Sequence, residues 1–431
     1  MGKKIRFKKK LAQLLKPFKW FYPGMGVKRW YLFSFIGIII IVTGGLFLSD
    51  PAKVNRISGI VFMFFGIAML AIGINRVMLM FIAVISPKDE LVDLVYQKKH
   101  LGRGQRIVAI GGGTGLSSLL QGLKQYTSNL AAIVTVADEG GSSGKLRKEF
   151  GVLPPGDIRN CLVALADTGP LMEDLFQYRF EGSSALTGHS FGNIFILALS
   201  QVTDGFEEAV QAASKILAIR GQVIPSTLSK VRLLAELQDG STALGEANIA
   251  ERKNLSPIKK ISLQPFSTKA TDSAIEAINN ADAIVFGPGS LYTSIIPNLL
   301  IDDIAENVNR STAAKIYVCN VMTQSGETDS YDVADHIKAM YDNTKLNNID
   351  YCLINSSDIP SHLADRYAKM RAFKVKSDID AIKKSNVTPI EDNLISVNRI
   401  NDIEYIRHNP RRLAKTIIDI ISIAKTEVAH R

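Results

Sequence analysis

Residues 106–123 read RIVAIGGGTGLSSLLQGL, and this stretch decides the fold. A short run of β-branched and apolar residues predicts a strand, four glycines between 111 and 115 predict a tight turn, and apolar residues at helical spacing predict a helix. Glycines let the backbone approach a ligand closely. The helix behind them directs unpaired N–H groups and its positive dipole end at the turn. The stretch therefore predicts an anion site, most simply for a nucleotide diphosphate.

The glycine spacing departs from both common phosphate-binding fingerprints. Gly111, Gly113 and Gly115 give G-x-G-x-G, with Leu116 at the position where the dinucleotide fingerprint G-x-G-x-x-G needs its last glycine. The later segment 141–146 is too short for a P-loop and lacks the hydroxyl that binds Mg²⁺. Hydride transfer and P-loop phosphoryl transfer are therefore disfavoured. A turn that serves only close strand-to-helix packing is the alternative interpretation.

The charge of the chain is concentrated in one tail. Residues 1–29 hold ten Lys or Arg and no Asp or Glu, which accounts for the whole formal charge of +10. A basic tail directly before a long apolar segment indicates a membrane surface as partner, and not a nucleic acid. The tail is expected to be cytoplasmic.

Residues 30–85 predict a transmembrane helical hairpin. Trp30 to Leu48 is nineteen residues without a charge, and Ile57 to Ile74 is eighteen more, each near the roughly 20 that a spanning helix needs. The excess of Lys and Arg before the first span places both termini in the cytoplasm, so the chain is predicted to be a two-span protein of the cell membrane. An apolar hairpin buried in a soluble core is the alternative interpretation.

The rest of the chain predicts a Rossmann-like α/β domain. Residues 86–105 are interpreted as a juxtamembrane linker, and 106–429 as a doubly wound, mostly parallel sheet with helices between its strands. Residues 222–266 alternate in period two and predict a small antiparallel insertion. The candidate strands of the sheet are 106–110, 131–136, 283–287, 315–319 and 350–354.

Polar, glycine-rich loops follow several of these strands. In open α/β sheets the ligand binds at the carboxyl ends of the strands, so the loops predict a shared site. Asp157 is equally well explained as a helix N-cap, and a lone residue such as His189 is commonly structural. The sequence identifies no catalytic residue and no metal-ligand spacing. The three cysteines are interpreted as buried thiols in a reducing compartment.

Taken together and in order, five motifs resemble the YvcK-type gluconeogenesis factors of the 2-phospho-L-lactate transferase (CofD-like) superfamily. The motifs span 110–116, 137–144, 154–160, 287–294 and 320–324. The resemblance covers about residues 106–425 and leaves the hairpin outside it. It implies a Rossmann-like domain that binds a UDP-sugar such as UDP-N-acetylglucosamine and influences cell shape and envelope synthesis during gluconeogenic growth. The transferases of the superfamily imply the alternative, an enzyme that cleaves a nucleotide diphosphate bond.

The resemblance also implies site residues and partners. Asp138 and Asp157 are the candidate ligands for Mg²⁺, and Arg407 is a candidate diphosphate contact, although it can equally belong to a solvated basic face. Glu139 and Asn409 each replace an Asp of the family pattern. Further expected partners are a second copy of the chain and proteins of cell-wall synthesis. The candidate ligand-binding residues are Gly111, Gly112, Gly113, Thr114, Gly115, Asp138, Gly140, Gly141, Ser142, Ser143, Gly156, Asp157, Asn160, His189, Asn193, Gly287, Gly289, Ser290, Asn320 and Arg407.

Overall fold

The computed structural model describes residues 27–49, 53–85, 101–167, 169–252, 256–400 and 403–429. The chain divides into two compact units, Met1–Lys98 and Lys99–Arg431. Most of the predicted basic tail, most of the predicted linker and the centre of the hairpin link lie outside the described residues.

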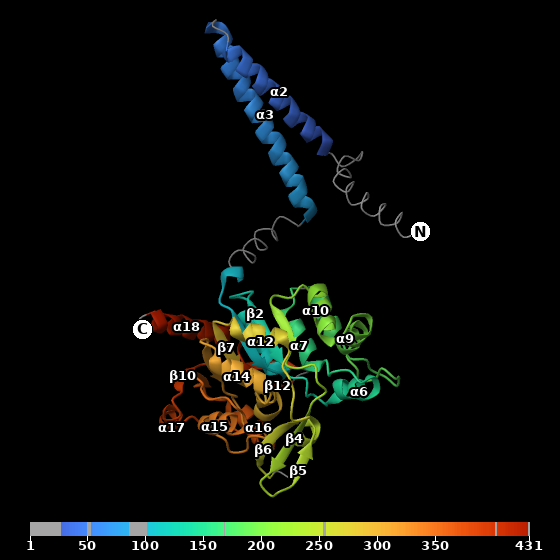
Figure 1. Ribbon diagram of the computed structural model, residues 1–431, viewed down its shortest axis with the longest axis vertical. Helices are drawn as coiled ribbons and strands as arrows, with labels where there is room; N and C mark the ends of the chain where they lie inside the picture. The colour runs from blue at the N-terminus through green and yellow to red at the C-terminus, as the bar shows by residue number, and fades with distance from the viewer. Residues whose placement is uncertain are drawn as a thin grey trace. The chain divides into compact units, whose positions relative to one another are not determined.

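The first unit contains two long apolar helices, α2 (Val27–Leu48) and α3 (Lys53–Ile85), drawn in blue in Figure 1. Their segments Arg29–Leu48 and Arg56–Leu79 are long and apolar enough to cross a membrane, and only 11% and 17% of these windows are buried. Glycines line the contact between the helices: a Cβ on Gly44 would lie 2.8 Å from the carbonyl oxygen of Gly59. Small residues at such a contact are typical of helices that pack in a membrane.

The second unit is built on a seven-stranded parallel sheet, in the order β10-β9-β8-β7-β1-β2-β3. The Rossmann-like α/β prediction is confirmed, and the five predicted strands are present. The strands β3 and β10 extend the sheet at its two ends. The bounds are β1 (Ile107–Gly111), β2 (Leu130–Val134), β3 (Gln222–Pro225), β7 (Ala283–Phe286), β8 (Ala314–Val318), β9 (Tyr351–Asn355) and β10 (Thr388–Asp392).

Alternate residues of each strand belong to two different cores. In β1, Ile107 and Ala109 pack into one core, and Val108 and Ile110 into the other, as expected for a strand covered on both faces. The helices of the first core are α5 (Gly113–Leu123), α7 (Gly156–Leu165), α8 (Pro170–Gln177), α9 (Phe191–Val202), α10 (Phe206–Ile216) and α18 (Pro410–Ala429). Those of the second are α12 (Asp272–Asn279), α13 (Ile296–Leu299), α14 (Asp302–Arg310), α15 (Val333–Asn343) and α17 (Ile379–Lys384) (Figure 1).

The antiparallel insertion is shorter than the predicted 222–266. The strands β4 (Arg232–Leu237), β5 (Thr242–Leu244) and β6 (Ile258–Gln264) form an antiparallel sheet in the order β5-β4-β6. Residues 222–225, by contrast, form β3, which pairs in parallel with β2. The prediction was wrong at this boundary because β3 is a buried strand without alternation, whereas β4 alternates between buried and exposed positions. A second antiparallel pair joins β11 (Ile395–Ile400) to β12 (Ile403–His408).

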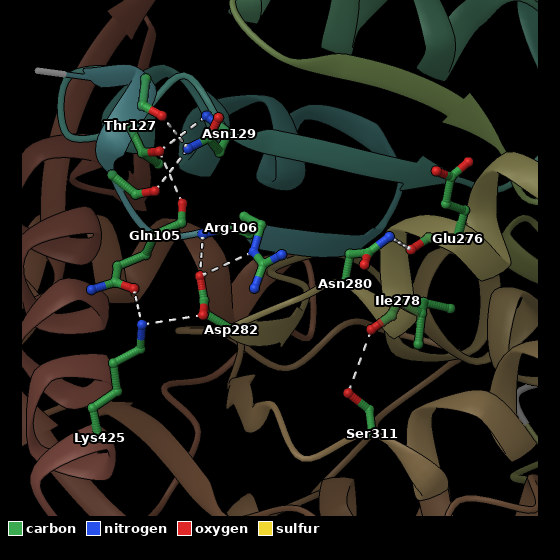
Figure 2. Close-up of polar contacts among 12 residues, drawn as sticks. Gln105, Arg106, Thr127, Asn129, Glu276, Ile278, Asn280, Asp282, Ser311 and Lys425 are labelled. Carbon is green, nitrogen blue, oxygen red and sulfur yellow. Dashed lines mark hydrogen bonds and ion pairs between the residues drawn. The ribbon is translucent and has the colours of Figure 1, made fainter. Parts of the chain in front are cut away.

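Polar contacts fasten the start of the second unit to its core (Figure 2). The side-chain amide of Asn129 donates to the carbonyl oxygen of Gly104 at 2.8 Å. The backbone N–H of Arg106 donates to the carboxylate of Asp282 at 2.7 Å, and Lys425 of α18 donates to the same carboxylate at 3.1 Å. The first strand, the loop before β7 and the C-terminal helix are thus held together at the amino-terminal edge of the sheet.

Candidate functional site

The order in which the chain adds strands reverses between β1 and β7: from β1 it goes outward to β2 and β3, and from β7 outward to β8, β9 and β10 on the other side. The candidate site begins at this point. Helix α5 follows β1 on one face of the sheet, whereas a π-helical turn, η3 (Leu291–Ile295), follows β7 on the other face. Such a switch point opens a crevice at the carboxyl ends of the two strands. The two loops touch closely: a Cβ on Gly115 would lie 2.5 Å from the carbonyl oxygen of Pro288.

The glycine loop adopts a backbone that favours glycine. Gly113 has a φ of +68°, in the left-handed region. A Cβ there would meet nothing nearer than the Ser294 hydroxyl oxygen at 4.0 Å, so the space in front of the loop is open. Gly112, the residue before α5, brings no side chain to cap the helix. The amino end of α5 is therefore open toward the crevice, apart from the Gly113 N–H, which donates to the carboxylate of Asp157.

Three carboxyl groups gather beside this loop. Asp157 lies in the first turn of α7, and burial together with the neighbouring Asp138 raises its pKa to about 7. Glu246 lies in the first turn of α11 (Glu246–Ala250), and burial and its contact with Asp138 raise its pKa to about 9. Groups with such perturbed pKa values concentrate at functional sites. Glu246 is not among the site residues predicted from sequence, because only the folding of the insertion brings it to Asp138.

A network of hydroxyl, amide and imidazole groups lies behind the next loop, which opens α6 (Gly141–Phe150). The Gly140 N–H donates to Asp138 at 2.8 Å. The Ser142 hydroxyl is 3.1 Å from Nδ1 of His189, and its oxygen accepts a hydrogen bond from the side-chain amide of Asn193 at 3.1 Å. Ser143 packs against the start of α7, since a Cβ on Gly156 would lie 2.4 Å from its hydroxyl oxygen. The structure thus brings the second and third predicted motifs together with the predicted site residues His189 and Asn193.

The arginine of the third motif, Arg159, ties this network to α7. Its guanidinium donates to Asn193 at 3.1 Å and to Asn160 at 2.7 Å, and it also contacts Ser190, which caps α9. The side chain is 5% exposed and has no carboxylate within ion-pair distance among the described residues. Asn160 is a predicted site residue and Arg159 is not, although both belong to the motif at 154–160.

The loops after β7 and β8 complete the crevice. The side chain of Asn320 donates to the carbonyl oxygen of Gly289 at 2.8 Å. Behind them lies Glu327, which accepts from the Tyr292 N–H and the Thr293 hydroxyl, each at 3.3 Å. Burial raises the pKa of Glu327 to about 7. The predicted residues Gly287 and Ser290 lie in the same segment, and Ser290 accepts the N–H of Ser294 at 2.9 Å.

Arg407 lies on β12, a strand that contacts α5. Its guanidinium makes no hydrogen bond or ion pair with any part of the chain that the structure describes, and it is half-buried. Arg407 thus lies on a strand beside α5, and its guanidinium is not held by a protein partner among the described residues.

The described residues contain no group of three or more His, Cys, Asp or Glu side chains arranged to hold a metal ion. Two carboxylates completed by ligand phosphates are nevertheless a common way of binding Mg²⁺, and Asp138 lies close enough to Asp157 to raise the pKa of Asp157. Their oxygen chemistry fits that cation. All three cysteines are buried thiols, as predicted.

A cavity of about 860 Å³ lies away from this site, at the amino-terminal edge of β1, β2 and β3 between α10 and α12. Figure 2 shows part of its wall, including Arg106, Asn129, Glu276 and Asn280. None of the predicted site residues lines it.

Comparison with known proteins identifies the family of the second unit. Residues 107–395 match the model of the family described as 2-phospho-L-lactate transferase CofD. Within that class the chain belongs to the gluconeogenesis factor family. It is 45% identical to the putative gluconeogenesis factor of Nostoc sp., over 93% of this chain and 92% of the relative, and 45% identical to the gluconeogenesis factor of Bacillus subtilis, over 74% of this chain and 99% of the relative.

A solved structure confirms the fold of the second unit. The chain resembles the crystal structure of protein BH3568 from Bacillus halodurans with a TM-score of 0.70 and 43% identity, covering 73% of this chain and all of that one. The match to the Nostoc relative extends well into residues 1–100. The expectation that the resemblance leaves the hairpin outside was therefore wrong for that relative, whereas it holds for the shorter Bacillus chains.

Proposed function

We propose that this chain is a membrane-anchored binding protein for a nucleotide sugar such as UDP-N-acetylglucosamine, and that its ligand state regulates cell shape and envelope synthesis in gluconeogenic growth. The observation that carries the proposal is the open amino end of α5 at the switch point, where Gly113 has a φ of +68° and a hypothetical Cβ would meet only open space. A helix amino terminus of this kind favours phosphate. Its relatives are named gluconeogenesis factors.

Each loop has a role in this proposal. The N–H groups of Thr114 and Gly115 would hold the diphosphate at the amino end of α5. At the start of α6, His189, held in place by Ser142 and Asn193, would contact the rest of the ligand through a hydrogen bond. Arg407, half-buried on the strand beside α5, would add a positive charge to the phosphates.

The membrane anchor is the second part of the proposal. Both segments of the hairpin are long and apolar enough to span a bilayer, and most of their surface is exposed. The ten basic residues before the first span favour a cytoplasmic N-terminus. Two crossings then return the second unit to the cytoplasm, where nucleotide sugars are made available to envelope synthesis.

The variant Gly113→Val tests the binding site. A β-branched residue at a φ of +68° is strained, and it also fills the space in front of α5, so affinity for UDP-N-acetylglucosamine should fall by at least about thirtyfold, or about 2 kcal/mol. Gly240→Val is the matched control, because Gly240 has a φ of +85° and open space in the β4–β5 turn. Calorimetry on both variants, with circular dichroism as a check of folding, gives the answer. Parent-like affinity in folded Gly113→Val would place the site elsewhere.

The carboxylates at the crevice favour one second candidate, a transferase that cleaves a nucleotide diphosphate bond. The matched family is described as a transferase. In this case Asp138 and Asp157 would hold Mg²⁺, which when bound supplies charge neutralisation at the phosphates. Incubation of the protein with UDP- and GDP-linked ligands and Mg²⁺, followed by an assay for released mononucleotide, distinguishes the enzyme from the binding protein. Release that disappears in Asp157→Asn supports the enzyme.

A further inference from the structure

Four buried side chains form a hydrogen-bonded chain from α7 to the start of α9. Arg159 donates to Oδ1 of Asn193 at 3.1 Å, Nδ2 of Asn193 donates to the Ser142 hydroxyl oxygen at 3.1 Å, and that hydroxyl lies 3.1 Å from Nδ1 of His189. None of the four is more than 5% exposed. Buried polar groups of this kind are costly unless every donor meets an acceptor, so the direction of each hydrogen bond is constrained.

The guanidinium sets that direction. Arginine has donors only, so the oxygen of the Asn193 amide must face Arg159 and its nitrogen must face Ser142. The amide nitrogen also only donates, so the Ser142 oxygen accepts. The Ser142 hydroxyl proton is then available for its other neighbour, Nδ1 of His189, since the described residues offer this hydroxyl no other partner.

The last bond fixes the tautomer of the imidazole. A neutral His189 that accepts at Nδ1 carries its proton on Nε2. The structure gives Nε2 no partner among the described residues, and it is absent from the fully buried unpaired atoms. The nitrogen therefore reaches accessible space as a free donor, beside the loop that opens α6.

We propose that the Arg159–Asn193–Ser142–His189 chain is a specificity determinant of the ligand site, which holds Nε2–H of His189 ready to donate to an oxygen of the ligand. This inference rests on the proposed function, because it assumes that the ligand occupies the crevice beside α6. The oxygen can belong to the diphosphate or to the sugar. Arg159 and Asn193 are positioning residues, and only His189 touches the ligand.

The substitution Asn193→Asp reverses the direction of the hydrogen bonds between residue 193, Ser142 and His189, and it keeps the contact with Arg159. The new carboxylate can pair with Arg159, so the fold should persist. It cannot donate to Ser142, which must then donate to the carboxylate and accept from Nδ1–H of His189. Nε2 then presents a lone pair to the ligand oxygen, and affinity should fall by about tenfold or more.

The test combines a tautomer measurement with a binding measurement on the full-length protein in detergent micelles. With ¹⁵N-labelled histidine at pH 8.5, the imidazole shifts of His189, assigned by the signal missing in His189→Gln, should report Nε2–H in the parent and Nδ1–H in Asn193→Asp. Calorimetry uses UDP and UDP-N-acetylglucosamine. A loss with both ligands assigns the oxygen to the diphosphate, and a loss with the sugar nucleotide alone assigns it to the sugar.

Ser142→Ala is the second variant, because it breaks the chain without adding a charge. It should give a mixed tautomer and a similar loss of affinity. An Nδ1–H tautomer in the parent, or affinity within twofold of the parent in folded Asn193→Asp, overturns the proposal. A parent that binds neither nucleotide refutes the proposed function and with it the ligand role of His189, whereas the tautomer still decides the direction of the hydrogen bonds.

Discussion

Replacing Glu327 by glutamine should make the second unit more stable at neutral pH. Glu327 is 3% exposed and supports the loop after β7 by accepting from the Tyr292 N–H, the Thr293 hydroxyl and the Gln324 amide. Glutamine can keep these contacts. Its oxygen can face Tyr292, while its NH₂ group faces the Thr293 hydroxyl and a reoriented Gln324 amide, both of which can accept. The substitution therefore removes a buried charge and leaves the shape unchanged.

The size of the change in unfolding free energy follows from the pKa of the Glu327 carboxyl group. Burial raises the pKa of Glu327 from 4.5 to about 7, against smaller opposing effects from its hydrogen bonds and from Arg252. That difference corresponds to about 3 kcal/mol. A raised carboxyl pKa means that the folded state binds the proton more tightly. The contribution of Glu327 to stability is therefore fully present below about pH 4.5 and is lost as the pH rises through about 7.

Urea denaturation of residues 99–431, followed by circular dichroism between pH 4.5 and pH 8, measures the effect. The difference in unfolding free energy between Glu327→Gln and the parent should grow by about 3 kcal/mol across this range in favour of the variant. Glu327→Ala is the control: it leaves the buried Tyr292 N–H without an acceptor, so its unfolding free energy should lie about 1–3 kcal/mol below that of Glu327→Gln at every pH. Its difference from the parent should change with pH as much as that of Glu327→Gln, because neither variant titrates at this position. A difference between Gln and parent that does not change with pH would refute the reasoning.

Four further outcomes are expected. Gly115→Ala should unfold or strongly destabilise the second unit, measured by thermal melting, because its Cβ would lie 2.5 Å from the backbone of Pro288. Arg407→Ala should weaken binding of UDP-N-acetylglucosamine by roughly 1.5–3 kcal/mol in calorimetry, the usual contribution of a charged hydrogen bond. A cysteine at Val54 should be labelled from outside intact cells and one at Gly2 should not; the reverse result contradicts the topology. Residues 100–431 expressed alone should be soluble and should keep ligand binding; a molten product would refute the boundary.

Sequence predicted the elements whose signal is local. The strand at 107–111 and helix α5 follow from adjacent residues, because apolar periodicity and a glycine turn need no distant partner. The same holds for the loops at the carboxyl edge of the sheet, since parallel strands place their ends together. β3 was assigned to the insertion because four residues are too few for periodicity to distinguish the two kinds of strand.

The parts of the site that sequence did not predict depend on long-range contacts. Glu246 lies more than a hundred residues beyond Asp138 and meets it only after the inserted sheet has folded against the crevice. Arg159 was overlooked because an arginine in an apolar helix is ordinarily turned outward, whereas here Ser190 and Asn193 bury it. The sequence around Arg159 does not reveal these partners, because they belong to a different helix, α9.

The charges of the crevice bear on both candidate functions. Asp157 accepts the Gly113 N–H, which belongs to the helix end that is expected to hold the diphosphate, and Asp138 and Glu246 lie beside it. A diphosphate that enters this crevice adds like charge to the carboxylates, so binding must be accompanied by proton uptake or by a cation. Glu246, with a pKa of about 9, already carries its proton at neutral pH. Asp157 has a pKa of about 7. It is therefore the group that would take up a proton from solution, or share Mg²⁺ with the phosphate, when the ligand binds. In a binding protein of this kind, binding of the diphosphate depends on the proton or cation that is bound with it. A transferase likewise needs a carboxylate and a cation next to the phosphates of its substrate.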